Sequence, residues 1–478
     1  MILNNFSFKT KPWEHQLKAL SYLYERDTAA LYTDMGTGKT KVMIDLIINK
    51  NFKRVLIVCT KKGCGVWEKE FKKHSDLPSG FVLNLSEMST VKKVQVIKSL
   101  PLKQISDNKT TLVLICNYES VWRDGFSNLL LTKRLGLDCV ICDESHKIKS
   151  PGSKCSKFLT KLGKRVEHRY LVTGTPLAEN PIDIYAQYRF LDPSIFGTNL
   201  ENFRNQYENL DVTRTIQVGY RVLDTKNPYK NLDELHEKMF SCAFKADSSV
   251  KLPPKRNIIY KFRISQKAEK LYRQLEKDGI LECEEGTLEV ENILNMSQRK
   301  QQILSGFLPV TSEEDFEQQN IPIDDSRAEA LSELLEGMPK SEPVVIFAQY
   351  QEDLKTIKSV CKKLGRGCSE LSGREDTEQD WQKGLTSVLA VQYASGSESV
   401  DFTKSKYCIY YSYTRSLAQY LQSKKRIHRP GQSRSVVYYH IVAQLSKGVS
   451  EDEKIVAALK NKKDVVDYIM NFEQNKSP

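Results

Sequence analysis

The sequence predicts an α/β protein with two lobes, each built on a parallel β-sheet, and a mostly helical insertion between them. Its 478 residues are enough for two or three domains with separate cores. Short apolar runs rich in β-branched or aromatic residues recur between helical or loop stretches, as strands buried on both faces of a parallel sheet do. The first group covers residues 55–59, 112–116, 139–142 and 170–173, and the second covers 344–347, 388–391, 407–411 and 436–442.

The region between the two groups of strands has a different composition. From about residue 190 to 323 it is rich in charged residues, Gln, Asn and Tyr, with helical patterning such as SQKAEKLYRQLEKDGILE. The segments KLPPKR and GFLPVTSEED interrupt it. We therefore expect a first lobe over residues 1–190, a helical protrusion and linker over 191–323, and a second lobe over 324–478 that ends in a helical brace.

The composition is that of an ordinary globular protein, with 40% hydrophobic and 28% charged residues. The 72 Lys and Arg outnumber the 60 Asp and Glu, and the net charge of +12 favours a polyanionic partner without establishing one. Several of the 11 Cys lie inside apolar runs, as buried reduced thiols do. Neither a signal peptide nor an apolar run of membrane-spanning length is visible, so we expect a cytoplasmic protein.

The strongest motif is a phosphate-binding loop ahead of an apolar run. It consists of Asp34, Met35, Gly36, Thr37, Gly38, Lys39 and Thr40. Gly36 and Gly38 let the backbone curl so that N–H groups face phosphate oxygens, and the following helix adds the positive end of its dipole. We expect Lys39 to hold the β- and γ-phosphates and Thr40 to offer its hydroxyl to Mg²⁺. The strict pattern has Gly where Thr33 stands.

Two adjacent carboxylates follow the third predicted strand of the first group. Asp143 and Glu144 open the string DESH, which ends in His146. Adjacent side chains on a strand point in roughly opposite directions, so the two carboxylates can do different work. We expect Asp143 in the Mg²⁺ shell and Glu144 as the group that orients and deprotonates an attacking water.

The motifs stand in an order that resembles the Swi/Snf-like family of superfamily-two helicase-type ATPases. PWEHQ at residues 12–16 resembles the family's glutamine motif, and DMGTGKT resembles its DMGLGKT. Further similar blocks are VLIVCTKKGCGVWEKEF (55–71), CNYE (116–119), DESH (143–146), VTGTPL (172–177), LPPK (252–255) and QSKKRIHRPGQ (422–432). The resemblance runs from about residue 12 to 465.

The resemblance implies two RecA-like lobes that bind ATP and Mg²⁺. It also implies that Gln16 lies against adenine and that other residues couple the nucleotide to lobe movement. The coupling residues are His146, Thr173, Gly174, Thr175 and Gln422.

The last motif holds two arginines three residues apart, Arg426 and Arg429. On one helix they would share a face and could reach one phosphate together. Presented by the second lobe, they would act as arginine fingers on the γ-phosphate, so hydrolysis would require the lobes to close.

Two segments depart from the family pattern. Residues 395–402 stand where the family has a glycine-rich stretch ending in Gly-x-Asn-Leu, with Ser399 for a glycine and Asp401 for an asparagine. The run AFK at residues 243–245 stands where Arg-Arg-x-Lys is common. A carboxylate at residue 401 would repel DNA or nucleotide, so the sequence assigns that segment no role.

Loops after the predicted strands offer cations, hydroxyls and amides to phosphates, which position a protein without reading sequence. The candidate nucleic-acid contacts are Lys61, Lys62, Asn117, Tyr118 and Thr175, with further positive charge at Lys147, Lys149 and Lys154. Family members run DNA across both lobes, so we expect non-specific binding of double-stranded DNA that weakens with salt.

Three functions remain compatible with these residues. The first is an ATP-dependent double-stranded DNA translocase, monomeric in isolation, that remodels DNA or protein–DNA complexes. The second is a strand-separating DNA or RNA helicase, and the third is an ATP-gated nucleic-acid-binding scaffold with little turnover. The compact form, without chromatin-reading segments, suggests a bacterial, phage or mobile-element protein with a role such as DNA repair or recombination.

Overall fold

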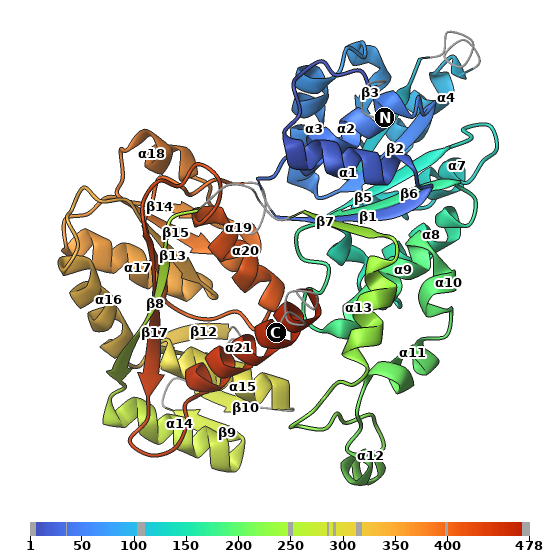
Figure 1. Ribbon diagram of the computed structural model, residues 1–478. Coiled ribbons are helices and arrows are strands. Elements are labelled where there is room, and N and C mark those ends of the chain that lie inside the picture. The colour runs from blue at the N-terminus through green and yellow to red at the C-terminus, as the bar shows by residue number, and fades with distance from the viewer. Residues whose placement is uncertain are drawn as a thin grey trace, which may run out of the picture. The chain divides into compact units, whose positions relative to one another are not determined.

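The computed structural model describes residues 6–34, 36–102, 110–246, 252–283, 286–289, 293–311, 318–396 and 400–470. Met35 of the predicted loop and Ser399 of the divergent segment lie outside these ranges. The chain packs as two compact units (Figure 1), one of residues Met1–Lys251 with Asp464–Pro478 and one of residues Leu252–Lys463.

The first unit is built on a parallel sheet in the order β3-β4-β2-β5-β6-β1-β7, counted over the described residues. Its strands are β1 (Thr28–Thr33), β2 (Arg54–Cys59), β3 (Val82–Asn84), β4 (Leu112–Asn117), β5 (Cys139–Asp143), β6 (His168–Thr173) and β7 (Ala243–Ala246). Every residue of β4 is buried, as expected for a strand covered on both faces. The four strands predicted in this part of the chain are confirmed.

Helices connect and cover these strands. They are α1 (Glu14–Tyr24), α2 (Lys39–Asn49), α3 (Lys61–His74), α4 (Thr90–Ser99), α6 (Tyr118–Val121), α7 (Phe126–Leu130), α8 (Lys154–Gly163), α9 (Ile184–Leu191), α10 (Pro193–Phe196), α11 (Leu200–Tyr207), α12 (Val212–Val218) and α13 (Leu232–Phe240). The central core joins β-strand residues such as Ile57 and Ile141 to Met43 of α2 and Trp67 of α3. Strands β2 and β5 therefore share one core with helices α2 and α3.

The second unit has a parallel sheet in the order β14-β15-β13-β16-β17-β8 within the described residues. Its strands are β8 (Lys255–Arg263), β13 (Val344–Ala348), β14 (Cys368–Leu371), β15 (Val388–Gln392), β16 (Tyr407–Tyr410) and β17 (Val436–Gln444). The helices are α14 (Gln266–Asp278), α15 (Ile293–Leu304), α16 (Ser326–Glu336), α17 (Gln351–Lys363), α18 (Glu378–Lys383), α19 (Tyr393–Gly396), α20 (Leu417–Ile427) and the part of α21 (Glu451–Met470) up to Lys463. The four predicted strands are again confirmed, and the two predicted RecA-like lobes are present.

The region between the predicted lobes contributes to both sheets. Strand β7 pairs with β1, and the green strand β8 lies beside the red strand β17 in Figure 1. Strands β9 (Ile280–Cys283), β10 (Gly286–Glu289), β11 (Phe307–Thr311) and β12 (Gln318–Pro322) form an antiparallel sheet next to the helices expected there. Strand β8 escapes a search for apolar runs because its sequence, KRNIIYKFR, leaves alternate residues exposed. The expected domain boundaries at 190 and 323 stay a prediction.

Among the described residues, no helix combines the length and the apolar character needed to cross a membrane.

Candidate functional site

The phosphate-binding loop connects strand β1, which lies between β6 and β7 in the sheet, to α2. Gly36 and Gly38 have φ values of 80° and 78°, a region that glycine enters without strain. Gly38 caps α2, so the loop's backbone leads directly into the positive end of the helix. The ammonium of Lys39 donates to the carbonyl oxygens of Thr33 and Asp34 at 3.0 and 3.2 Å. The structure therefore has the loop-and-helix geometry that the sequence predicts, with Thr40 in the first turn.

Thr33, which stands where the strict pattern has glycine, stabilises the loop. Its hydroxyl accepts a hydrogen bond from the Thr37 hydroxyl at 3.1 Å, and the same Thr37 hydroxyl lies 2.7 Å from the Asp34 carbonyl. Both threonines are buried. The departure from the pattern therefore adds a contact across the loop and does not distort it.

Gln16 packs directly on this loop. Its side-chain nitrogen donates to the Thr37 carbonyl at 3.1 Å, and its oxygen accepts the backbone N–H of Trp13 at 2.8 Å. His15 also contacts the Thr37 carbonyl, at 2.9 Å. A Cβ at Gly38 would lie 2.2 Å from the Gln16 amide nitrogen, so only glycine admits this approach. The contact of Gln16 with adenine stays a prediction.

Asp143 and Glu144 lie at the carboxyl end of β5, where α/β sheets carry their sites. Glu144 has φ 53° and ψ 51°, a left-handed conformation that is uncommon outside glycine. Burial, followed by repulsion from Glu144, raises the pKa of Asp143 to about 6, and Lys39 opposes that rise. A left-handed residue beside a carboxyl with a raised pKa is typical of a functional site.

The predicted coupling residues of the first lobe meet around Glu144. The Thr173 hydroxyl donates to Glu144 Oε2 at 3.2 Å, and His146 Nδ1 lies 3.4 Å from the same oxygen. The Thr173 and Thr175 hydroxyls lie 3.2 and 3.4 Å from His146 Nδ1, and the backbone N–H of Thr175 donates to Thr173 Oγ1. Burial lowers the pKa of His146 to about 4, so its imidazole is neutral at neutral pH. Gly174 lies within this turn.

Two aromatic side chains that the sequence did not single out for this role hold Asp143. The indole Nε1 of Trp67 donates to Asp143 Oδ2 at 2.8 Å, and the Tyr118 hydroxyl donates to the Asp143 carbonyl at 2.7 Å. The backbone N–H of Glu144 donates to Asp143 Oδ1 at 3.0 Å. A buried Trp or Tyr needs a polar partner, which is the signal the sequence offers, but its identity depends on tertiary packing.

The chemistry of these residues suits the binding of a nucleoside triphosphate with Mg²⁺. The loop offers backbone N–H groups, the Lys39 ammonium and the Thr40 hydroxyl, which are phosphate and Mg²⁺ ligands. A divalent cation would stabilise the Asp143 carboxylate, whose ionisation is disfavoured by burial and by the neighbouring Glu144. The donor set is oxygen-rich, as Mg²⁺ requires.

The last motif spans the end of α20 in the second unit. Arg426 is 7% exposed on the last turn, whereas Arg429 lies beyond the helix, which ends at Ile427. The expectation that both arginines share one helical face is therefore wrong. Pro430 disfavours a helical conformation at the residue before it, and Gly431 follows with φ 105°, so the helix stops short of Arg429. Gln422 is buried on α20.

Hydrogen bonds tie this motif to distant segments of the same unit. His428 Nε2 contacts the Pro253 carbonyl of the LPPK segment at 2.7 Å. Gln432 donates to the carbonyl oxygens of Thr403 and Ser405. In the divergent segment, Asp401 Oδ2 lies 3.9 Å from Arg429 Nε. The substituted carboxylate therefore faces one of the two predicted arginine fingers.

The candidate nucleic-acid contacts differ in exposure. Lys61 and Lys62 are exposed in the first turn of α3, and Lys61 lies 3.5 Å from Glu87. Asn117, Tyr118 and Thr175 are buried and bonded within the lobe. Their contact with nucleic acid stays a prediction, and the structure presents the two lysines as the accessible members of the set.

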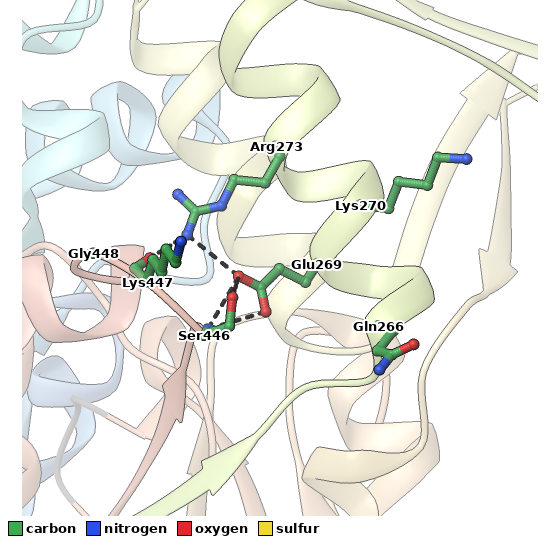
Figure 2. A pocket seen from close by; sticks show the side chains of 7 residues that line it. All are labelled: Gln266, Glu269, Lys270, Arg273, Ser446, Lys447 and Gly448. Carbon is green, nitrogen blue, oxygen red and sulfur yellow. Dashed lines mark hydrogen bonds and ion pairs between the residues drawn. The ribbon is translucent and has the colours of Figure 1, made fainter.

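A pocket of about 630 Å³ lies elsewhere in the second unit (Figure 2). Its lining is Gln266, Glu269, Lys270, Arg273, Ser446, Lys447 and Gly448. Figure 2 shows Arg273 and Ser446 directed at Glu269, which accepts the Ser446 hydroxyl at 2.7 Å and an Arg273 N–H at 3.3 Å. Glu269 is thus bonded within the pocket, and no predicted site residue lines it.

Comparisons with known proteins agree with the motif order. A family model described as SNF2-related domain matches residues 15–306, and one described as helicase conserved C-terminal domain matches residues 326–431. The chain is 24% identical over 523 residues to the DNA repair and recombination protein RAD54B of Gallus gallus, covering 96% of this chain and 54% of that protein. It is 28% identical over 264 residues to the transcriptional regulator ATRX of Homo sapiens, covering 50% of this chain and 10% of that protein.

The solved Sulfolobus solfataricus SWI2/SNF2 ATPase core in complex with dsDNA is similar with a TM-score of 0.43 and 17% identity, covering 92% of this chain and 89% of that chain. The chain spans about half the length of RAD54B and a tenth of the length of ATRX. Because the SNF2-related model covers more than half of the 478 residues, the chain belongs to the SNF2-related family of helicase-type proteins, as its motifs suggest.

Proposed function

We propose that the protein is an ATP-dependent translocase on double-stranded DNA, which couples hydrolysis to lobe closure and movement along the duplex. The observation that carries the proposal is the network around Glu144, which joins the DESH carboxylates to the Thr173–Thr175 turn. RAD54B is named for DNA repair and recombination, and that name supports DNA as the substrate.

Each residue of the first lobe has a specific task in this proposal. The loop residues bind the phosphates, with Lys39 on the β- and γ-oxygens, and Thr40 and Asp143 hold Mg²⁺, which when bound neutralises phosphate charge. Glu144, oriented by the Thr173 hydroxyl at 3.2 Å, accepts the proton of the attacking water. Neutral His146 contacts both Glu144 and Thr175, so a change in the position of Glu144 moves the turn that carries Thr175.

The second lobe supplies positive charge. Arg426 and Arg429 stabilise the charge that develops on the γ-phosphate, and Gln422 lies on the same helix as Arg426. Since the phosphate-binding loop and the arginines belong to different lobes, hydrolysis requires closure, and each cycle of closing and opening advances the protein along one strand. Phosphate contacts such as those of Lys61 and Lys62 hold the duplex without reading its sequence.

The test is steady-state ATP hydrolysis with no nucleic acid, duplex DNA, single-stranded DNA and RNA. Glu144→Gln is the inactive reference, because glutamine keeps an oxygen that accepts the Thr173 bond but cannot take a proton. Glu336→Gln, an exposed residue at the end of α16, is the matched control. We expect strong stimulation by duplex, weakened by salt and abolished only by Glu144→Gln.

Other outcomes decide between the alternatives. If single-stranded DNA or RNA stimulates best, the protein is a strand-separating helicase. If nothing stimulates and the wild type equals Glu144→Gln, the motor is refuted and an ATP-gated scaffold takes its place.

A further inference from the structure

Helix α3 presents one face to the core and the other to solvent. Its buried side chains Cys64, Trp67, Phe71 and His74 recur at helical spacing. Thr60 caps the helix by accepting the backbone N–H of Gly63 at 3.2 Å, which fixes where the first turn begins. This rigid element therefore sets the position of the Trp67 ring.

Trp67 is 1% exposed, and its indole packs against Phe71 with ring centroids 6.2 Å apart. Its only polar atom, Nε1, donates to Asp143 Oδ2 at 2.8 Å. An indole N–H does not titrate in the physiological range, so the donor is present at every working pH. This hydrogen bond joins two residues that are 76 positions apart in the sequence. Its acceptor is the carboxylate that binds Mg²⁺ in the proposed function.

The bond fixes the rotation of the Asp143 carboxylate. One oxygen is held by the Trp67 indole and the other by the backbone N–H of Glu144 at 3.0 Å, while the Tyr118 hydroxyl holds the main-chain carbonyl. Each carboxylate oxygen has a second lone pair that can face a cation. Partners of this kind orient metal ligands, and removing one typically weakens metal affinity about 10- to 100-fold.

The same helix begins with Lys61 and Lys62, which are exposed and proposed to contact phosphate. Trp67 lies six positions after Lys61, which is about 9 Å along a helix axis. A backbone shift at the first turn is passed along the helix because its hydrogen bonds and buried face resist bending. A shift of the helix caused by binding at the lysines would therefore move the indole.

We propose that Trp67 is a positioning residue, which orients the Asp143 carboxylate for Mg²⁺ and ties that orientation to nucleic acid bound at the first turn of α3. This inference rests on the proposed function, because it needs Asp143 as the Mg²⁺ ligand. It assigns Trp67 no direct contact with nucleotide. By linkage, duplex DNA and magnesium-bound nucleotide must then change each other's affinity by the same factor.

The experiment measures binding and not turnover. Calorimetric titration with adenylyl imidodiphosphate, an ATP analogue that is not hydrolysed, gives the affinity with and without Mg²⁺, and with and without a short duplex. Trp67→Phe keeps an aromatic ring but removes the N–H. We expect it to weaken Mg²⁺-dependent nucleotide binding about tenfold, to leave Mg²⁺-free binding unchanged, and to reduce the effect of duplex on nucleotide affinity.

Two controls separate positioning from packing. Phe71→Leu disturbs the core beside Trp67 and leaves the indole bond in place, so it should lower the melting temperature but keep the Mg²⁺ dependence. Trp122→Phe makes the same exchange at a partly exposed ring, which lies 5.0 Å from the Lys154 ammonium.

The outcomes distinguish this inference from the proposed function. A wild-type protein without Mg²⁺-dependent nucleotide binding would overturn both. A Trp67→Phe variant with the wild-type Mg²⁺ dependence would overturn only the role of Trp67. If Phe71→Leu loses Mg²⁺ dependence as well, the effect is one of packing and the positioning role is wrong. If Trp67→Phe loses Mg²⁺ dependence but keeps the full duplex effect, the tie to nucleic acid is wrong.

Discussion

The carboxylate of Asp401 in the second lobe lies close to one of the proposed arginine fingers. Asp401 stands where the family pattern has asparagine, and its Oδ2 lies 3.9 Å from Arg429 Nε. Asp401 is half-exposed, with 53% of its side chain accessible. Exposed pairs contribute no more than about 1 kcal/mol, so the carboxylate holds Arg429 weakly in place.

We expect Asp401→Asn to raise kcat for ATP hydrolysis by up to about fivefold, because an amide cannot hold the guanidinium by charge. Asparagine keeps an oxygen that accepts the Thr403 N–H, now 2.8 Å from Asp401 Oδ1, so the loop is preserved. Steady-state kinetics at low and high salt provide the check, since screening should shrink the difference. A fall in kcat would contradict this interpretation of the pair.

Asp353 in the first turn of α17 makes stability depend on pH. It is 1% exposed, and its Oδ2 accepts the Ser412 hydroxyl at 2.5 Å and the Tyr350 N–H at 3.1 Å. Burial raises its pKa from 3.8 to about 6. The folded state thus binds more protons than the unfolded state between these values, so this group's contribution to stability falls as pH rises through the window.

Asp353→Asn should remove that dependence, because an amide does not titrate. We expect the melting temperature of the variant relative to the wild type to increase between about pH 4.5 and pH 7.5. Differential scanning calorimetry at several pH values measures the shift. A difference that stays constant with pH would show that the carboxyl does not titrate in this window.

At the scale of elements, α3 and α20 show how helix ends place charge. Helix α3 starts at an exposed pair of lysines after the Thr60 cap, and α20 ends before Arg429 because Pro430 follows. In both cases the charged side chains lie at a helix end and not along a helical face. The position at which each helix begins or ends therefore determines where these charged side chains lie.

Replacing Lys61 and Lys62 together by Gln should reduce the salt dependence of duplex binding. Each lost phosphate contact lowers the slope of log K against log salt by about 0.9, so we expect a slope shallower by about 1.8 for the pair. Fluorescence anisotropy at several salt concentrations gives the slope. Lys362→Gln with Lys363→Gln, exposed at the end of α17, is the matched control and should leave the slope unchanged.

At the scale of the whole molecule, the proposed chemistry divides between the units. The phosphate-binding loop, Asp143 and Glu144 belong to the first, and Arg426 and Arg429 belong to the second. Mutations of the arginines should therefore affect hydrolysis more than nucleotide binding.

Arg426→Ala should lower kcat at least about 10³-fold and change nucleotide affinity little, because the loop that binds nucleotide is in the other unit. Steady-state kinetics and calorimetric titration with a non-hydrolysed analogue measure the two effects. Lys425→Gln, one residue earlier on α20, controls for lost positive charge. Equal losses in affinity and kcat would place Arg426 in ground-state binding instead.

Much of the site could be predicted from the sequence because its signals are local. The loop's glycines, the acids at the end of a buried strand, and the Thr173–Thr175 turn each depend on a few neighbouring residues. The eight predicted strands were recognisable because burial on both faces demands apolar runs. Strand β1, TAALYT, was missed because it is rich in Ala and Thr and has no β-branched apolar residue, although it leads straight into the loop.

The sequence by itself determined the family, the two parallel-sheet lobes and the identity of the candidate catalytic residues, since these depend on the order and spacing of local patterns. Only the tertiary structure decided that Trp67 holds Asp143, that Asn117 and Tyr118 are buried, and that Asp401 faces Arg429. Those contacts join residues far apart in the chain. Their existence depends on strand order and on where each helix begins and ends, which no local pattern specifies.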